Sequence, residues 1–88
     1  MEIMVEEKIM VHFQFGLQEN KATEFVQKAS AFCSEIILIK NEKSVDAKSI
    51  MGVMSLVVRK GEVVTIITDG NDEQKAIEVI RDFLLVEN

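Results

Sequence analysis

The sequence predicts an α+β fold in which four strands form a sheet that helices cover on one face only. Three observations predict it. Apolar and polar residues alternate in some segments, apolar residues recur every three or four positions in others, and glycine or turn residues separate the segments. The chain has 88 residues, 48% of them hydrophobic, and no proline, so it can bury one modest core. We expect a single domain over residues 1–88.

A strand and a helix open the chain. The odd-numbered positions of residues 9–15 are apolar while His12 and Gln14 interrupt the other face, which is the period of a half-buried strand. Gly16 then breaks the run. Over residues 19–33 apolar side chains return at helical spacing, which predicts one amphipathic helix of about four turns. Its apolar stripe consists of Ala22, Phe25, Val26, Ala29, Phe32 and Cys33.

A hairpin and a short helix come next. Residues 36–40 are apolar and rich in β-branched side chains, residues 44–47 alternate, and the Asn-Glu pair near the middle has turn character, which predicts two paired strands. Ser49 then precedes a short apolar stretch and is well suited to the N-cap of a helix. This helix is expected to end before Gly61.

A fourth strand and a last helix complete the chain. Residues 62–68 are rich in Val, Ile and Thr, which predicts a strand with both faces largely apolar, and Asp69-Gly70 closes it. Asn71 or Asp72 can cap the helix that follows. Its buried stripe is predicted to be Ala76, Ile77, Ile80, Phe83 and Leu84. The predicted order is therefore β-α-β-β-α-β-α.

Composition excludes several classes of function. Ten basic and fifteen acidic residues give a net charge of −5, and Trp and Tyr are absent, so binding to nucleic acid is not expected. The apolar runs are about four residues long and the first residues are acidic, which supports neither membrane insertion nor secretion. The single cysteine agrees with a reducing compartment. We expect a cytoplasmic protein.

The residue types that carry catalysis are sparse. His12 is the sole histidine, has no second ligand nearby in the sequence, and is expected on one face of the first strand rather than in a metal or catalytic site. Cys33 falls on the helical stripe and is expected in the core. The four glycines have neither dinucleotide-binding nor P-loop spacing. We therefore expect no metal, no cofactor and no enzymatic activity.

Two segments carry a resemblance to a known family. Residues 46–56 read Asp-Ala-Lys-Ser-Ile-Met-Gly-Val-Met-Ser-Leu, and residues 69–73 read Asp-Gly-Asn-Asp-Glu and are followed by Ala76. In the predicted element order, these segments resemble the regulatory serine motif and the last strand-to-helix turn of HPr, the histidine-containing phosphocarrier family. The resemblance implies an open-faced β-sandwich, a four-stranded antiparallel sheet with three helices on one face.

The active-site segment departs from the HPr pattern. HPr proteins usually carry Gly, an aliphatic residue, His, Ala, Arg, Pro and Ala where residues 16–22 read Gly-Leu-Gln-Glu-Asn-Lys-Ala. In the family the histidine receives a phosphoryl group from enzyme I and the arginine helps to hold it. Gln18 stands at the histidine position, and its amide nitrogen is not a phosphoryl acceptor because its lone pair is delocalised. Asn20 stands at the arginine position and provides no bidentate clamp.

A glutamine at the histidine position resembles the Crh-type branch of HPr-like proteins. This implies a regulatory protein of the phosphotransferase and carbon catabolite system that does not carry phosphohistidine. Ser49 is expected to be phosphorylated by HPr kinase/phosphorylase, and the product to bind a catabolite-control transcription regulator. Helical spacing alone would bury the apolar residues of the short helix, whereas the resemblance implies a docking surface. The expected partner-binding residues are Gln18, Lys48, Ile50, Met51 and Met54.

Two other functions stay open. A phosphocarrier with an unforeseen acceptor would take label from phosphoenolpyruvate through enzyme I. A diverged binding or scaffold domain would accept phosphate from neither donor. An exchangeable first strand could also produce a swapped dimer, and the sequence does not decide between monomer and dimer.

Overall fold

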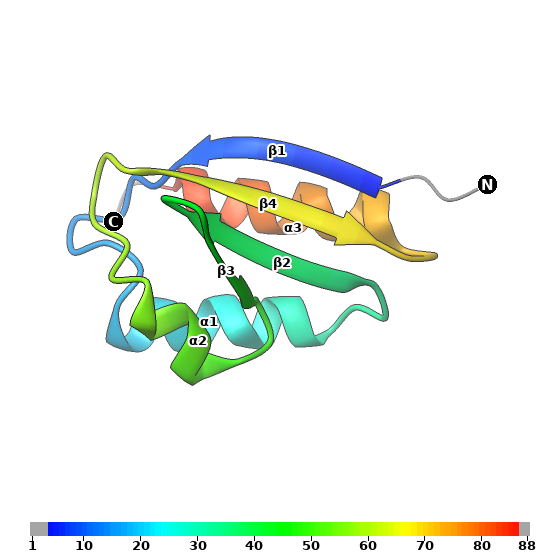
Figure 1. Ribbon diagram of the computed structural model, residues 1–88, viewed down its shortest axis with the longest axis horizontal. Coiled ribbons are helices and arrows are strands. Elements are labelled where there is room, and N and C mark those ends of the chain that lie inside the picture. Colours follow the sequence, from blue (N-terminus) through cyan, green and yellow to red (C-terminus); the bar gives the residue numbers. More distant parts are fainter. Residues whose placement is uncertain (1–3, 87–88) are drawn as a thin grey trace.

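The structure, a computed structural model, describes residues 4–86 and has the predicted element order (Figure 1). Four strands form one antiparallel sheet in the order β1-β4-β2-β3, and three helices accompany it, which confirms the open-faced sandwich. The elements are β1 (Met4–Met10), α1 (Glu19–Ser30), β2 (Glu35–Lys40), β3 (Lys43–Asp46), α2 (Ile50–Ser55), β4 (Val63–Asp69) and α3 (Glu73–Leu85).

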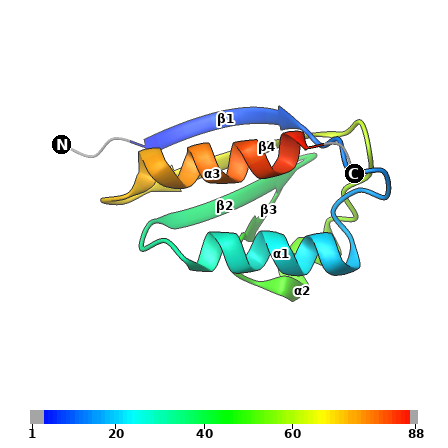
Figure 2. The same ribbon diagram turned by 180° about the vertical axis from the view of Figure 1, so that it is seen from behind.

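The core lies between the sheet and the two long helices, α1 and α3 (Figure 2). Side chains of directly paired residues point to the same face of a sheet, so the register decides which positions are buried together. Ile9 of β1 pairs with Val64 of β4, and Leu38 of β2 pairs with Ile66 of β4; all four are buried. The helices contribute Ala22, Phe25, Ala29, Ala76, Ile77, Ile80 and Leu84 to the same cluster.

The first strand begins and ends earlier than the sequence predicts. β1 covers Met4–Met10 and not residues 9–15, and it pairs along its whole length with β4. The inward position of Glu7 conceals this strand in the sequence, because Glu7 pairs with the buried Ile66 and its charge is met by Arg81 of α3 at 3.2 Å. His12 therefore lies beyond the strand, and its backbone N–H donates to the carbonyl of Leu84.

The predicted burial of Phe15 and Cys33 is wrong. A turn in which the N–H of Gly16 donates to the carbonyl of Phe13 at 2.9 Å reverses the chain, and Phe15 is left 80% exposed. α1 ends at Ser30, so helical spacing no longer applies at Cys33, which is exposed. An alternating or helical pattern predicts burial only for residues that lie within the strand or helix itself.

The last strand agrees with the prediction, whereas one detail of the last helix differs from it. β4 buries only the face that the helices cover, because Val64, Ile66 and Thr68 are buried while Val63 is 50% exposed on the other side. Asp72 occupies the N-cap position of α3, but its carboxylate does not cap the helix. The carboxylate instead accepts hydrogen bonds from Ser34 in the loop between α1 and β2.

Candidate functional site

The turn between β3 and α2 places Ser49 at the start of a short helix. The carboxylate of Asp46 accepts from the N–H of Lys48, and the carbonyl of Asp46 accepts from the N–H of Ser49 at 3.0 Å. Ser49 is the N-cap residue of α2, and its Oγ accepts from the N–H of Gly52 at 3.1 Å. The predicted N-cap is confirmed, and Ser49 is half-buried.

Helix α2 turns most of its large apolar side chains outward. Val53 is fully buried, whereas Met51 is 79% exposed and Ile50 and Met54 are each exposed by more than a third. Val57, two residues after the helix, is 45% exposed. Exposed apolar side chains gathered on one turn of helix mark a surface suited to contact with another protein, and thioethers adapt to differently shaped partners.

Two lysine side chains form hydrogen bonds that connect the segments on either side of α2 to the rest of the molecule. Lys48 Nζ donates to the carbonyl of Phe32, 2.8 Å away, just beyond the end of α1. Lys40 Nζ donates to the carbonyls of Leu56 and Val57 at 3.1 and 2.8 Å and forms an ion pair with Glu62 at 2.9 Å. The hydrogen bond from Lys40 lowers the pKa of the Glu62 carboxyl. Neither ammonium group is directed at the hydroxyl of Ser49.

Gln18 lies at the N-cap of α1 without capping it. Its backbone carbonyl accepts from Lys21 and Ala22, but its side chain makes no capping hydrogen bond. Nε2 of Gln18 is buried and has no hydrogen-bond partner within the described part of the chain. Asn20, at the position where the family has arginine, is exposed. A hollow of about 440 Å³ adjoins this segment and is lined by Phe13, Phe15, Gly16, Gln18, Glu19, Asn20 and Lys21.

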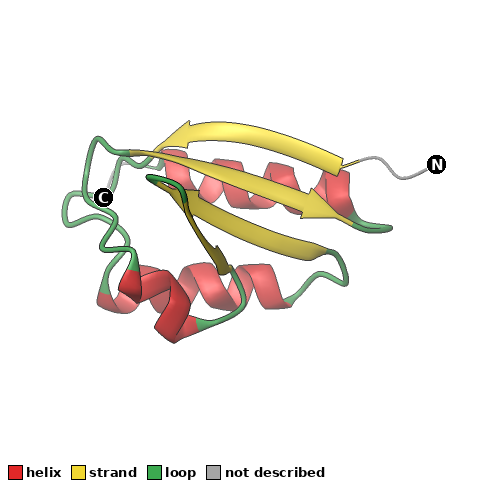
Figure 3. Ribbon diagram, in the orientation of Figure 1, coloured by secondary structure: helices red, strands yellow, loops and turns green. Residues whose placement is uncertain are grey.

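The fold brings the Gln18 loop and the end of α2 together. The N–H of Leu17 donates to the carbonyl of Val58 at 2.9 Å. Gly16 has φ +72°, and a Cβ at that position would lie only 2.2 Å from the same carbonyl, so the contact requires glycine. Figure 3 shows the two loops side by side at one end of the sheet. Gln18 and the apolar surface of α2 therefore belong to one end of the molecule.

Phe15 is the residue at this end that sequence reasoning missed. It lines the hollow beside Gln18 and is the most exposed large apolar side chain of the described residues. The signal was present in Gly16, because a glycine directly after an alternating run can turn the chain and place the preceding side chain outside.

The described residues contain no group of three or more His, Cys, Asp or Glu side chains placed to hold a metal ion. Within the same part of the chain, no helix is long and apolar enough to cross a membrane.

Comparison with known proteins identifies the family. A family model described as the PTS HPr component phosphorylation site matches residues 5–85. The chain belongs to the HPr family. This confirms the resemblance found in residues 46–56 and 69–73, and it covers almost all of the described structure.

Among HPr-family members, two relatives are HPr-like proteins named Crh. The chain is 49% identical to Crh of Halalkalibacterium halodurans over 81 residues, which cover 92% of this chain and 96% of that protein. It is 47% identical to Crh of Bacillus subtilis, with 92% of this chain and 95% of that protein covered. HPr and Crh proteins are phosphocarriers or regulators, and these similarities support an HPr-like regulatory protein of the phosphotransferase and catabolite system.

Solved HPr-family structures agree with the fold. The phosphocarrier protein HPr of Bacillus anthracis superimposes with a TM-score of 0.91 at 41% identity, covering 92% of this chain and 96% of that one. A crystal structure of Bacillus subtilis Crh, described as a swapped, intertwined dimer, gives a TM-score of 0.74 at 46% identity, with coverage of 91% and 92%.

Proposed function

We propose that this chain is a regulatory HPr-like protein that an ATP-dependent HPr kinase/phosphorylase phosphorylates on Ser49, and that then binds a catabolite-control transcription regulator. The observation that carries the proposal is Ser49 at the N-cap of α2, next to the exposed side chains of Ile50, Met51 and Met54. Serine, docking surface and helix lie within six residues of one another, so a kinase and a regulator can both recognise the same segment.

Phosphorylation of Ser49 is compatible with the fold. The γ-phosphoryl group of ATP forms a bond to Oγ while its bond to ADP breaks, and the kinase takes up the hydroxyl proton. Oγ keeps a lone pair for the Gly52 N–H, and the added charge of about −1.5 to −2 lies at the positive end of a helix. Lys48 Nζ donates a hydrogen bond to the carbonyl of Phe32, so we expect the partner to supply most of the cations that bind the phosphate.

Phosphotransfer through residue 18 is not part of the proposal. A primary amide offers no basic nitrogen, whereas imidazole has a pKa of roughly 6.5 and keeps one free near neutral pH. Nε2 of Gln18 is also buried, and Asn20 cannot form the two parallel bonds that an arginine makes with a phosphate. In this proposal the side chains of Gln18 and Phe15 contact partner proteins and take no part in phosphoryl transfer.

The first test is the intact mass of the protein after incubation with HPr kinase/phosphorylase and ATP. We expect the mass of one phosphoryl group to be added to the wild-type chain and to Ser55→Ala, and none to be added to Ser49→Ala. Ser55 is a suitable control because it lies at the other end of the same helix, where its hydroxyl donates to the carbonyl of Gly52. Equal labelling of all three proteins, or no labelling of the wild type, contradicts the proposal.

A second arm tests the docking surface. Met51→Ser removes the most exposed thioether of α2 without touching the core, so it leaves the fold intact. We expect the Ser49-phosphorylated form of this variant to bind a LacI-type regulator roughly tenfold more weakly than phosphorylated wild type, as truncation of a central interface residue does. Incubation with phosphoenolpyruvate and enzyme I is expected to add no phosphate, and label found there would favour a phosphocarrier.

A further inference from the structure

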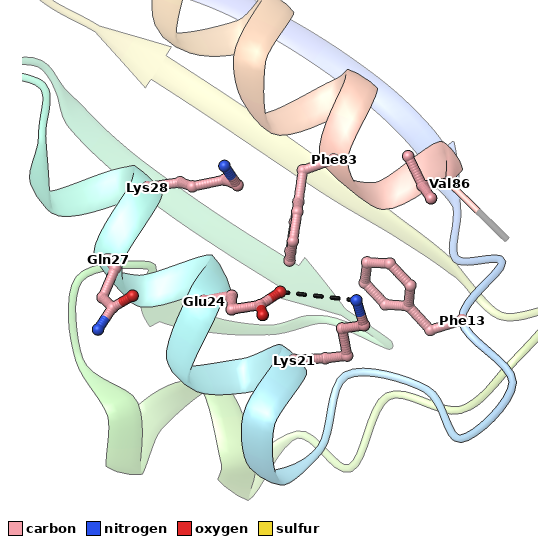
Figure 4. Close-up of a pocket in the computed structure, with 7 residues that line it drawn as sticks. All are labelled: Phe13, Lys21, Glu24, Gln27, Lys28, Phe83 and Val86. Carbon is pink, nitrogen blue, oxygen red and sulfur yellow. Dashed lines mark ion pairs between the residues drawn. The ribbon is translucent and has the colours of Figure 1, made fainter. Parts of the chain in front are cut away.

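A second cleft lies between α1 and the C-terminal turn of α3 (Figure 4), and it shares Phe13 and Lys21 with the hollow beside Gln18. Its volume is about 460 Å³, which falls in the range of small-molecule sites. Both helices line it, and the loop after β1 closes one end. The lining residues are Phe13, Lys21, Glu24, Gln27, Lys28, Phe83 and Val86.

The floor of the cleft is aromatic and its rim is basic. The rings of Phe13 and Phe83 meet edge to face, with their centroids 5.0 Å apart. Lys21 Nζ lies 4.8 Å from the centroid of Phe13 and 5.8 Å from that of Phe83, and Lys28 Nζ lies 5.4 Å from that of Phe83. Figure 4 shows the two lysines rising from α1 on either side of the Phe83 ring.

The charges in the cleft do not balance. Lys21 pairs with Glu24 at 3.5 Å, whereas Lys28 forms no ion pair with any residue of the described part of the chain. One positive charge is therefore in excess, in a protein whose net charge is −5. Both ammonium groups face ring carbons, which accept no conventional hydrogen bond, so each keeps donors available for an anion.

We propose that this cleft binds a small organic anion with a flat apolar body. Its acidic group, a carboxylate or a phosphate monoester, lies between Lys21 and Lys28. Its body covers the half-buried ring of Phe83, which packs edge to face against the buried ring of Phe13. The ligand exchanges the weak cation–π contacts of both lysines for charge-assisted hydrogen bonds, and it removes the exposed part of the Phe83 ring from water. The site is separate from Ser49 and does not depend on the function proposed above.

The test uses four probes added to the full-length protein, with binding followed by shifts of assigned backbone amide NMR signals. Benzoate and phenyl phosphate each have an acidic group and an aromatic ring. Benzyl alcohol has the ring without the acidic group, and inorganic phosphate has the acidic group without the ring. We expect saturable shifts around Lys21, Lys28 and Phe83 for at least one of the first two probes, which also tells a carboxylate site from a phosphate site. Benzyl alcohol and inorganic phosphate are expected to bind at least tenfold more weakly.

Matched charge variants decide whether the lysines form a site. Lys28→Gln and Lys21→Gln each remove one cation from the cleft, and we expect each to weaken binding of the better probe by at least fivefold. Lys75→Gln makes the same change on α3 outside the cleft and is expected to alter the affinity less than twofold. No saturable shift for either aromatic acid at 10 mM overturns the proposal, as does equal weakening by all three variants. Shifts centred on residues 15–18 and α2 overturn it as well. Failure of Ser49 phosphorylation leaves this test unaffected.

Discussion

At the scale of single residues, the hairpin between β2 and β3 contains two non-glycine residues with positive φ. Asn41 and Glu42 form its two-residue loop, with φ +51° and +71°. Two-residue hairpin loops with positive φ at both positions favour Asn followed by Gly, because a residue with a Cβ is strained at the second position. Glu42 is exposed and makes no contact that would compensate within the described residues.

Glu42→Gly is therefore expected to raise the free energy of unfolding by about 1 kcal/mol, since glycine adopts this conformation without a Cβ clash. Urea unfolding followed by circular dichroism measures the change. Glu42→Ala removes the same carboxylate but keeps the Cβ, so it should give no such gain. An equal gain in both variants would assign the effect to charge instead of backbone strain.

Val57 and Gln18 show how single residues at the candidate site depart from ordinary preferences. Val57 is β-branched and has φ +51°, a conformation that such residues rarely adopt, and the ammonium of Lys40 binds its carbonyl. Gln18 keeps a buried amide nitrogen without a partner. Both lie at the end of the molecule where the Gln18 loop meets α2, and strained or unsatisfied groups are most often retained where a surface has a function.

At the scale of elements, Asp72 joins two segments far apart in the sequence. Its carboxylate accepts from the N–H groups of Cys33 and Ser34, each at 2.9 Å, and from the hydroxyl of Ser34. Gly70 permits this approach, because a Cβ there would lie 2.7 Å from the Cα of Ser34. The start of α3 is thus tied to the loop between α1 and β2.

These hydrogen bonds predict a pH dependence of stability. The Ser34 hydroxyl lowers the pKa of Asp72 from its ordinary value of 3.8, and the N–H of Cys33 acts in the same direction. A carboxyl with a lower pKa in the folded state adds stability above its unfolded pKa and loses it as pH falls through the folded value. Asp72→Asn should therefore unfold more easily than wild type at pH 7, with a difference that narrows below pH 4.

Thermal unfolding between pH 2 and 7 measures this. Asp82→Asn is the matched control, because its carboxylate is exposed and contacts only the adjacent Arg81 among the described residues. A difference for Asp72→Asn that is constant over the whole range would rule out the linkage.

At the scale of the whole molecule, the sheet is buried on one face and open on the other. The helices cover Ile66 and its neighbours, whereas Ile37, Ile39 and Ile67 line the uncovered face and are half-buried by one another. The described molecule measures 38 × 23 × 20 Å, which leaves room for only one core. Almost every fully buried side chain belongs to that single cluster. Stability must then depend strongly on the face to which a residue points.

Adjacent isoleucines of β4 test this asymmetry. Ile66→Ala leaves a cavity in the core and is expected to lower the free energy of unfolding by about 2–5 kcal/mol. Ile67→Ala removes the same atoms from the open face, where water can refill the space, and should cost less than half as much. Chemical denaturation of both variants gives the comparison, and equal losses would mean that something covers the open face in solution.

Much of the candidate site could be predicted because it is local. The N-cap role of Ser49 depends on the residue type and on the apolar stretch that follows, all within one turn of helix. The outward direction of Met51 and Met54 could not be predicted in the same way, because helical spacing alone favours burial and the sheet and α1 decide which side of α2 is covered. The direction of the Lys48 side chain could not be predicted either, because its hydrogen bond to the carbonyl of Phe32 joins residues 16 positions apart.

The sequence by itself determined the order of the seven elements, most of the inward stripes of α1 and α3 and the family pattern around Ser49, because these follow from spacing and composition over a few turns. Only the tertiary structure decided the bounds of β1, the exposure of Phe15 and Cys33 and the meeting of the Gln18 loop with α2. Glu7 explains why: its inward position is tolerated only because Arg81, 74 residues away, supplies the opposite charge. Periodicity records neighbours along the chain, and such partners arise only when the chain folds.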